Sequence, residues 1–153
     1  MTGQATEIRP LAADDEAPWR GLWTAYLDFY DTRVDEQVYR TTFARLLAGN
    51  GGAAGEFQGR LALLGGQPVG LTHFLFHRHG WQVADVCYLQ DLYVAPDQRG
   101  KGIGRALIQA VYEAADAAGV TNVWWLTQDF NADARALYDK VAKLTPFIKY
   151  TRL

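Results

Sequence analysis

The stretch Arg99-Gly100-Lys101-Gly102-Ile103-Gly104 decides the fold because of what lies on either side of it. Before it runs a strand-like segment, Val86 to Val94, closed by Ala95-Pro96-Asp97. After it, apolar residues recur at steps of three and four from Ile103 to Ala114, which predicts a helix. The first N–H groups of such a helix have no internal partner, and the helix dipole favours an anion there. The stretch therefore predicts a phosphate-binding loop.

The composition of the loop supports a phosphate ligand. Glycines at 100, 102 and 104 let the backbone approach a ligand without Cβ clashes, and Arg99, Lys101 and Arg105 add positive charge. A Walker A loop is excluded because Lys101 is followed by Gly102 instead of Ser or Thr. A dinucleotide fingerprint is disfavoured because the third glycine comes one position too early and antiparallel-looking strands precede the loop.

The chain as a whole predicts one domain over residues 1–153. Hydrophobic residues make up 49% of it, and 15 basic against 17 acidic residues give a net charge of −2, so we expect no nucleic-acid partner. No apolar run approaches a membrane span, and residues 1–4 do not begin a secretory signal. The single cysteine, Cys87, fits a reducing compartment, so we expect a cytoplasmic protein.

The periodicities predict an α+β fold, with a mixed β-sheet flanked by helices on both faces. The order is strand, helix, helix, three strands, helix, strand, helix, strand. The expected strands are 8–11, 57–64, 69–76, 83–94, Asn122 to Thr127 and Phe147 to Thr151, and the expected helices are 14–30, 35–48, 103–118 and 132–143. Asp14 or Asp15, Asp35 and Asn131 stand where helix N-caps are favoured.

These motifs resemble a known family. Arg99-x-x-Gly102-x-Gly104, after a strand ending Asp91-Leu92-Tyr93-Val94-x-Pro96, is similar to the acyl-CoA loop of the GNAT N-acetyltransferase superfamily. The order of elements matches that fold over nearly the whole chain, and Asn131…Tyr138 resembles the family's late motif. Residues 88–94 resemble the diamine and polyamine branch, and also small bacterial and fungal enzymes that acetylate histone tails or free amino acids.

The resemblance implies an acyl-CoA-dependent N-acetyltransferase. The acetyl group of acetyl-CoA would pass to a primary amine by direct attack in a ternary complex, without a metal. The acceptor would be a small-molecule amine or a protein or peptide amine, and enzymes of this size are often homodimers, with Phe147 to Leu153 as a strand that could pair or exchange. A non-catalytic acyl-CoA-binding or regulatory domain, and a loop that binds ATP, are the alternatives.

The resemblance also assigns roles to residues. The strand would bind the pantetheine arm through its backbone, a bulge in it would open the cleft, and Tyr138 would protonate the departing thiolate. Asn131 would either contact the cofactor or only cap the last helix. The implied cofactor contacts are Leu92, Tyr93, Val94, Arg99, Gly100, Lys101, Gly102, Ile103, Gly104, Arg105 and Asn131.

The catalytic base is where the chain departs from the family. Gln90 stands where polyamine acetyltransferases carry a glutamate, and an amide cannot accept the proton. Three alternatives remain: Asp91 accepts the proton, a chain of water molecules carries it, or the acceptor amine arrives with a lower pKa. Gln90 would then orient the acceptor by hydrogen bonding. On a regular strand Asp91 faces away from Gln90, so it needs a bulge to turn it; otherwise it is a structural acceptor.

Several other residues have both a structural and a functional interpretation. Tyr26 and Tyr30 either wall the acceptor pocket or belong to a core stripe, and the acidic residues Asp28, Asp31, Asp35 and Glu36 either attract a cationic amine or cap helices. His73, His77 and His79 share one parity and are expected on a polar strand face or hairpin tip, without metal. We expect Cys87 to be inert packing and Trp124 and Trp125 to pack on opposite faces of a buried strand.

Overall fold

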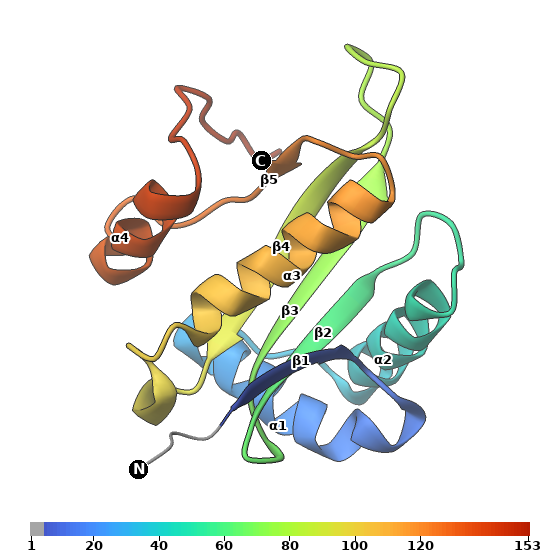
Figure 1. Ribbon diagram of the computed structural model, residues 1–153, viewed down its shortest axis with the longest axis vertical. Coiled ribbons are helices and arrows are strands. Elements are labelled where there is room, and N and C mark those ends of the chain that lie inside the picture. The colour runs from blue at the N-terminus through green and yellow to red at the C-terminus, as the bar shows by residue number, and fades with distance from the viewer. Residues whose placement is uncertain (1–4) are drawn as a thin grey trace.

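The structure, a computed structural model, describes residues 5–153 as a five-stranded mixed sheet with helices on both faces (Figure 1). The strands follow one another across the sheet in the order β1-β2-β3-β4-β5; the pairs from β1 to β4 are antiparallel and β5 is parallel to β4. The elements are β1 (Thr6–Pro10), α1 (Glu16–Phe29), α2 (Glu36–Asn50), β2 (Gln58–Leu64), β3 (Gln67–His77), β4 (Val86–Val94), α3 (Ile103–Ala117), β5 (Val123–Trp124) and α4 (Ala132–Val141). The expected α+β class and order are confirmed as far as α4.

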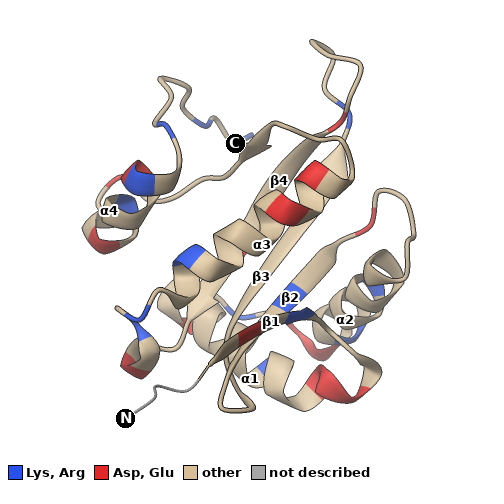
Figure 2. Ribbon diagram, viewed as in Figure 1, with Lys and Arg blue, Asp and Glu red and all other residues tan. Residues whose placement is uncertain are grey.

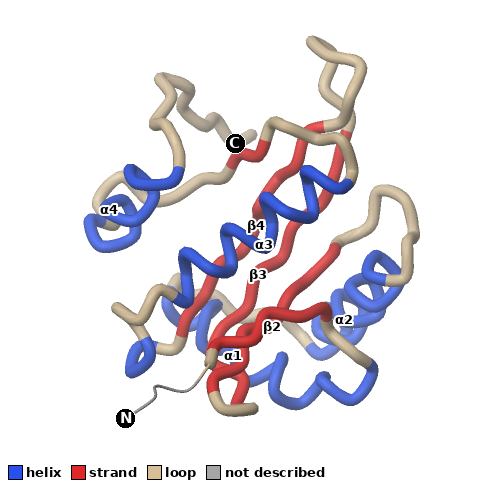
Figure 3. The backbone as a smooth tube through the Cα atoms, in the orientation of Figure 1, coloured by secondary structure: helices blue, strands red, loops and turns tan. Residues whose placement is uncertain are grey.

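Each face of the sheet has its own apolar core. On one face, α1 and α2 cover β2 to β4 through buried residues that include Trp19, Leu46 and Tyr93. On the other, α3 packs through Ile108 and Val111 on side chains of β3 and β4, and Figure 3 shows it crossing those strands. A fully buried large apolar side chain stabilises the fold by about 1.5–3 kcal/mol, so both helix layers hold the sheet firmly. Cys87 lies in the second core, where burial raises the pKa of its thiol to about 12.

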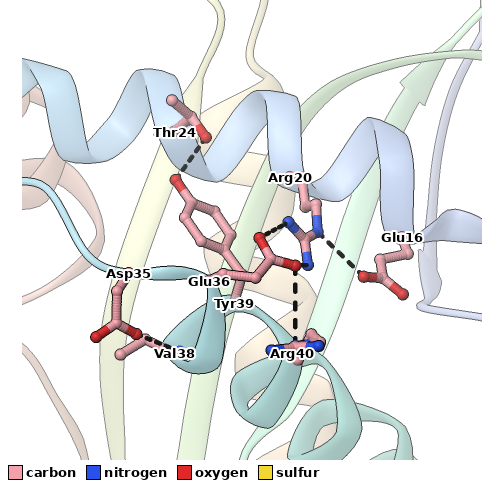
Figure 4. A network of polar contacts seen from close by, with 8 residues as sticks. All are labelled: Glu16, Arg20, Thr24, Asp35, Glu36, Val38, Tyr39 and Arg40. Atoms are coloured by element: carbon pink, nitrogen blue, oxygen red, sulfur yellow. Dashed lines mark hydrogen bonds and ion pairs between the residues drawn. The ribbon is translucent and has the colours of Figure 1, made fainter.

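An ion-pair network joins α1 to α2 (Figure 4). The guanidinium of Arg20 donates to both carboxylate oxygens of Glu36 at 2.7 Å and to Glu16 at 3.0 Å. Asp35 caps α2 by accepting the N–H of Val38 at 3.2 Å. Asp35 and Glu36 therefore have the structural roles that the sequence left open, whereas Asp28 and Asp31 are exposed.

The last expected strand, Phe147 to Thr151, does not form. Residues 142–153 contain no helix or strand, and their large apolar side chains, Leu144, Phe147, Ile148, Tyr150 and Leu153, are all exposed. The physical reason lies in β5, which is two residues long instead of 122–127 and offers almost no backbone edge to pair with. Trp124 is exposed and Trp125 half-buried, so the expectation of a buried strand there was wrong.

Other boundaries moved by a few residues. A 3-10 turn at Ala13–Asp15 precedes α1, where the Asp15 carboxylate binds Arg9 at 2.7 Å and the N–H of Ala12 at 2.7 Å instead of capping α1. β4 begins at Val86, three residues later than expected. Within residues 5–153 no helix is both long and apolar enough to cross a membrane. Residues 1–4, which the secretory-signal expectation concerns, lie outside the described residues.

Candidate active site

The loop before α3 has the properties of an anion-binding site. The backbone N–H groups from Gly100 to Arg105 have no hydrogen-bond acceptor within residues 5–153. Gly100 and Gly102 have φ angles of 79° and 81°, and a Cβ built on either would meet no atom within 4 Å. The loop therefore offers a run of N–H donors without acceptors, beside two glycines that leave open space, as a phosphate ligand requires.

Two of the basic side chains around the loop make hydrogen bonds to neighbouring residues. Arg99 donates through Nε to the carbonyl of Val94 at 3.0 Å, and Lys101 donates to the side-chain oxygen of Gln98 at 2.8 Å. Ile103 is buried and anchors the first turn of α3. Arg105 is exposed, and Figure 2 shows a basic position at this end of α3. All three loop cations remain at the surface, where they add positive charge around the free N–H groups.

One edge of β4 is open beside this loop. β5 pairs with β4 only at Cys87 and Tyr88, so within residues 5–153 the edge from Leu89 to Val94 has no strand partner on that side. The chain enters α3 directly beyond this edge, and a Cβ on Gly104 would lie 3.8 Å from Val94 and 3.3 Å from Leu137 of α4. The open edge and the free loop donors therefore form one continuous path along β4.

The bulge that Asp91 needed is present in β4. His73 of β3 lies opposite Asp91 and Phe74 lies opposite Leu89, so Gln90 is an extra residue without a partner. Leu89 and Leu92 consequently both pack on the α3 side of the sheet, while Asp91 and Tyr93 face the α1 side. The hydroxyl of Thr72 donates to the Asp91 carbonyl at 2.8 Å and secures the bulged backbone.

Asp91 lies in a half-enclosed aromatic environment. Its residue surface is 8% exposed, whereas the neighbouring Gln90 is exposed at the bulge. Burial, and then the negative charge of Asp91, raise the pKa of Tyr26, Tyr30 and Tyr88, so all three phenols lie close enough to be affected by its charge. The structure thus brings Asp91, Tyr26 and Tyr30 together.

The histidines do not share the environment that the sequence suggested. His73 is 2% exposed and its Nδ1 lies 2.8 Å from Oδ2 of Asp91, so the expected polar strand face was wrong for this residue. His77 lies farther along β3, where its Nε2 accepts the indole N–H of Trp124 at 3.3 Å. No group of three or more His, Cys, Asp or Glu residues in the described part of the chain could hold a metal ion.

Tyr138 stands on α4 and lies near Tyr30, which follows the last residue of α1. Burial, and to a smaller degree Tyr30, raise the pKa of its hydroxyl to about 12. Its ring packs edge-on against Trp125, with 5.4 Å between centroids, and its hydroxyl has no partner among the described residues. Asn131 caps α4 by accepting the N–H of Ala134 at 3.4 Å. The cap uses its Oδ1 atom.

Sequence reasoning missed two residues that touch this site from inside: His73, and Trp19 of α1. The indole N–H of Trp19 donates to Nε2 of His73 at 2.9 Å. A signal was available, because His73 interrupts the apolar run from Val69 to Phe76, and histidine is uncommon in so buried a strand unless it is hydrogen-bonded.

Comparison with known proteins assigns the chain to a family. Residues 18–142 match the Acetyltransferase (GNAT) family. The chain is 36% identical to the D-amino-acid N-acetyltransferase of Saccharomyces cerevisiae, over 99% of this chain and 93% of that protein. It is 34% identical to the thialysine N-epsilon-acetyltransferase of Caenorhabditis elegans, over 54% of this chain and 51% of that one. The chain therefore belongs to the GNAT family.

Solved structures show the same fold. An aminoglycoside N-acetyltransferase in complex with CoA superposes with a TM-score of 0.83 at 18% identity, covering 99% of this chain and 97% of that one. The ribosomal-protein-alanine N-acetyltransferase from Brucella melitensis biovar Abortus 2308 gives 0.74 at 24% identity, covering 97% and 99%. By family, this protein is an acetyl-CoA-dependent N-acetyltransferase.

The loop makes a prediction about cofactor binding. Gly102→Val should weaken acetyl-CoA binding at least about tenfold, because it adds a branched side chain at the N-terminus of α3, beside N–H groups that have no acceptor among residues 5–153, and strains a positive φ. Titration calorimetry measures the affinity.

Gly66→Val is the matched control. Gly66 has a φ of 80°, open space around its Cβ position and a place in the β2–β3 turn. It should show a comparable loss of stability from backbone strain, of about 1–3 kcal/mol, with unchanged affinity. Equal affinity in both variants would mean that the loop does not hold the diphosphate.

Proposed function

We propose that this enzyme acetylates the primary amine of a small molecule, and that the amine attacks the thioester directly while both substrates are bound. The observation that carries the proposal is the bulge at Gln90, which turns the buried Asp91 carboxylate toward a group of tyrosines next to the open edge of β4. The named relatives act on D-amino acids and thialysine, which are small amines.

The cofactor would be held by backbone groups. The N–H groups from Gly100 to Arg105 would bind the diphosphate, and the free edge of β4 from Leu89 to Val94 would pair with the pantetheine arm. Tyr93 is buried beneath this edge and contributes through its backbone. Acetyl-CoA supplies the acetyl group as a thioester, whose carbonyl carbon is open to attack by an amine. Holding both partners in one cleft supplies the orientation.

The acceptor would enter on the α1 side of β4. An amine is mostly an ammonium ion at neutral pH, and a carboxylate in a poorly solvated site attracts it strongly. Asp91 would bind this ammonium and take its proton, which leaves the nitrogen lone pair free to attack. Tyr26 and Tyr30 would form the aromatic wall, and Gln90 would orient the acceptor by hydrogen bonding from the exposed side of the bulge.

Tyr138 would assist the departing sulfur. A pKa of about 12 means that its hydroxyl stays protonated throughout the physiological range. It also makes the phenol a weaker acid than an ordinary tyrosine, so a hydrogen bond that stabilises the developing thiolate is favoured over early transfer of the proton.

We also propose a homodimer that forms through the C-terminal segment, residues 142–153. Its large apolar side chains, from Leu144 to Leu153, are exposed within residues 5–153. A second copy fits this surface because the same segments of two chains can bury their apolar side chains against each other about a two-fold axis.

Asp91→Asn should lower kcat/KM for the amine by about 100-fold or more at pH 7, because a positioned base contributes about 10²–10⁴ in rate. Acetyl-CoA affinity should stay unchanged. The variant should recover as the pH rises toward the pKa of the amine, since the acceptor then arrives neutral. Steady-state kinetics over pH 7–10, with the exposed Asp116→Asn as control, measure this. A flat profile at the wild-type level would remove Asp91 from the mechanism.

Tyr138→Phe should reduce kcat by about tenfold to a thousandfold with little change in acetyl-CoA affinity, since it deletes one donor to the developing anion. Because the hydroxyl must be protonated and its pKa lies near 12, the ratio of wild-type to variant kcat should stay constant from pH 7 to 10. A ratio that halves by pH 10 would show a phenol with the ordinary pKa of about 10, and a ratio of 1 throughout would show no role.

Truncation after Lys143 tests the dimer. Light scattering after gel filtration should give twice the chain mass for the full-length protein and a single chain mass for the truncated one. A full-length protein that remains a monomer at about 100 μM, well above the Kd of most stable homodimers, would contradict the proposal.

A further inference from the structure

The Asp91 carboxylate is held from inside the protein by a chain of two hydrogen bonds that ends on α1. The indole N–H of Trp19 donates to Nε2 of His73 at 2.9 Å, and Nδ1 of His73 lies 2.8 Å from Oδ2 of Asp91. Trp19 is 0% exposed, His73 2% and Asp91 8%. The three residues come from α1, β3 and β4, so the chain of bonds exists only in the folded protein.

The chemistry of the first residue fixes the proton positions in the whole chain. An indole nitrogen can only donate a hydrogen bond, so Nε2 of His73 must be the unprotonated acceptor. The single proton of the neutral ring is then on Nδ1, which donates to Asp91. His73 has no acceptor left, so it cannot take a proton from Asp91 and does not act as a second base.

Trp19 is itself rigidly placed. Its ring stacks on Trp23 at 5.2 Å between centroids and lies 5.2 Å from Phe43 of α2. A ring packed on both sides has no room to rotate its N–H away from His73. The α1–α2 pair is in turn tied together by the bidentate contact of Arg20 with Glu36. The orientation of the Asp91 carboxylate therefore depends on the packed interface between α1 and α2.

We propose that Trp19 and His73 are positioning residues, which hold Asp91 as an oriented carboxylate with Oδ2 occupied and Oδ1 left for the acceptor amine. The inference rests on the proposed function, because it specifies how the base of that reaction is aimed. Without this support the carboxylate would stand at a strand bulge with only the tyrosines near it, free to turn about its side-chain torsions.

Four variants separate positioning from packing. His73→Phe removes both bonds, and His73→Asn keeps an amide N–H close to where Nδ1 lies, so that it still donates to Asp91. Trp19→Phe removes only the donor to His73. Trp23→Phe is its control, because Trp23 is also buried and its indole N–H has no partner among the described residues.

The expected pattern is specific to the amine substrate. Kinetically, kcat/KM for the amine should fall about 10- to 100-fold in His73→Phe, as loss of a hydrogen bond to a charged group predicts. It should fall about threefold to tenfold in Trp19→Phe and in His73→Asn, both of which lose the bond from the Trp19 indole, and remain within about threefold of wild type in Trp23→Phe. Acetyl-CoA affinity should stay unchanged in all four, and melting temperatures should be similar for Trp19→Phe and Trp23→Phe.

A second measurement uses the free protein. In ¹⁵N-labelled protein, imidazole resonances assigned by loss in His73→Asn should show Nδ1 protonated and Nε2 unprotonated, and Nδ1 should stay protonated in Trp19→Phe because the Asp91 carboxylate still accepts its N–H. The opposite tautomer, wild-type kinetics in His73→Phe, or equal losses of kcat/KM in Trp19→Phe and Trp23→Phe would overturn the inference. If Asp91→Asn itself kept wild-type activity while the predicted tautomer was present, the proposed base would fail separately from this hydrogen-bond chain.

Discussion

One additional residue in β4 decides the geometry of this enzyme. Gln90 has no partner on β3, and this single offset reverses the side of the sheet on which every later residue of the strand lies. Leu92 thereby joins Leu89 under α3, which completes the apolar contact of that helix. Asp91 is turned to the other face, where a charge would be costly without the hydrogen bond that His73 provides.

The same strand also connects the two halves of the site. Its pairing with β5 ends at Tyr88, which leaves its edge open, and it leads to the loop whose backbone N–H groups have no acceptor in the described part of the chain. The anion-binding end needs only backbone atoms and glycine conformations, so it is largely independent of side-chain chemistry. The proposed acceptor end would depend on a buried carboxylate, and so on the packing of α1 against β3 and β4.

The sequence predicts those parts of the fold and the site that depend on local patterns. The loop and α3 were recognisable because spacing alone places glycines at the helix start and an apolar stripe behind them. Resemblance to the family added the expected bulge and Tyr138. Which residue of β3 lies opposite Asp91 was not predictable, because this pairing is not coded locally. For the same reason His73 was expected on a polar face, although it lies between Trp19 and Asp91 in the core.

The absent sixth strand has a similar explanation. Residues 147–151 have strong β propensity, but propensity needs a neighbouring strand to pair with, and the two-residue β5 does not offer one within this chain. Trp124 shows the same effect at the end of the sheet, where it stacks on Tyr88 at 4.2 Å instead of being buried between layers.

The most direct test of the central claim is a crystal structure with a bisubstrate compound in which the acceptor nitrogen is joined to the coenzyme A sulfur through a short linker. The account predicts the diphosphate on the N–H groups from Gly100 to Arg105 and the linked nitrogen about 3 Å from Oδ1 of Asp91, the ordinary length of such a hydrogen bond. A complex in which the nitrogen is bound elsewhere, with Asp91 contacting only protein groups, would contradict it.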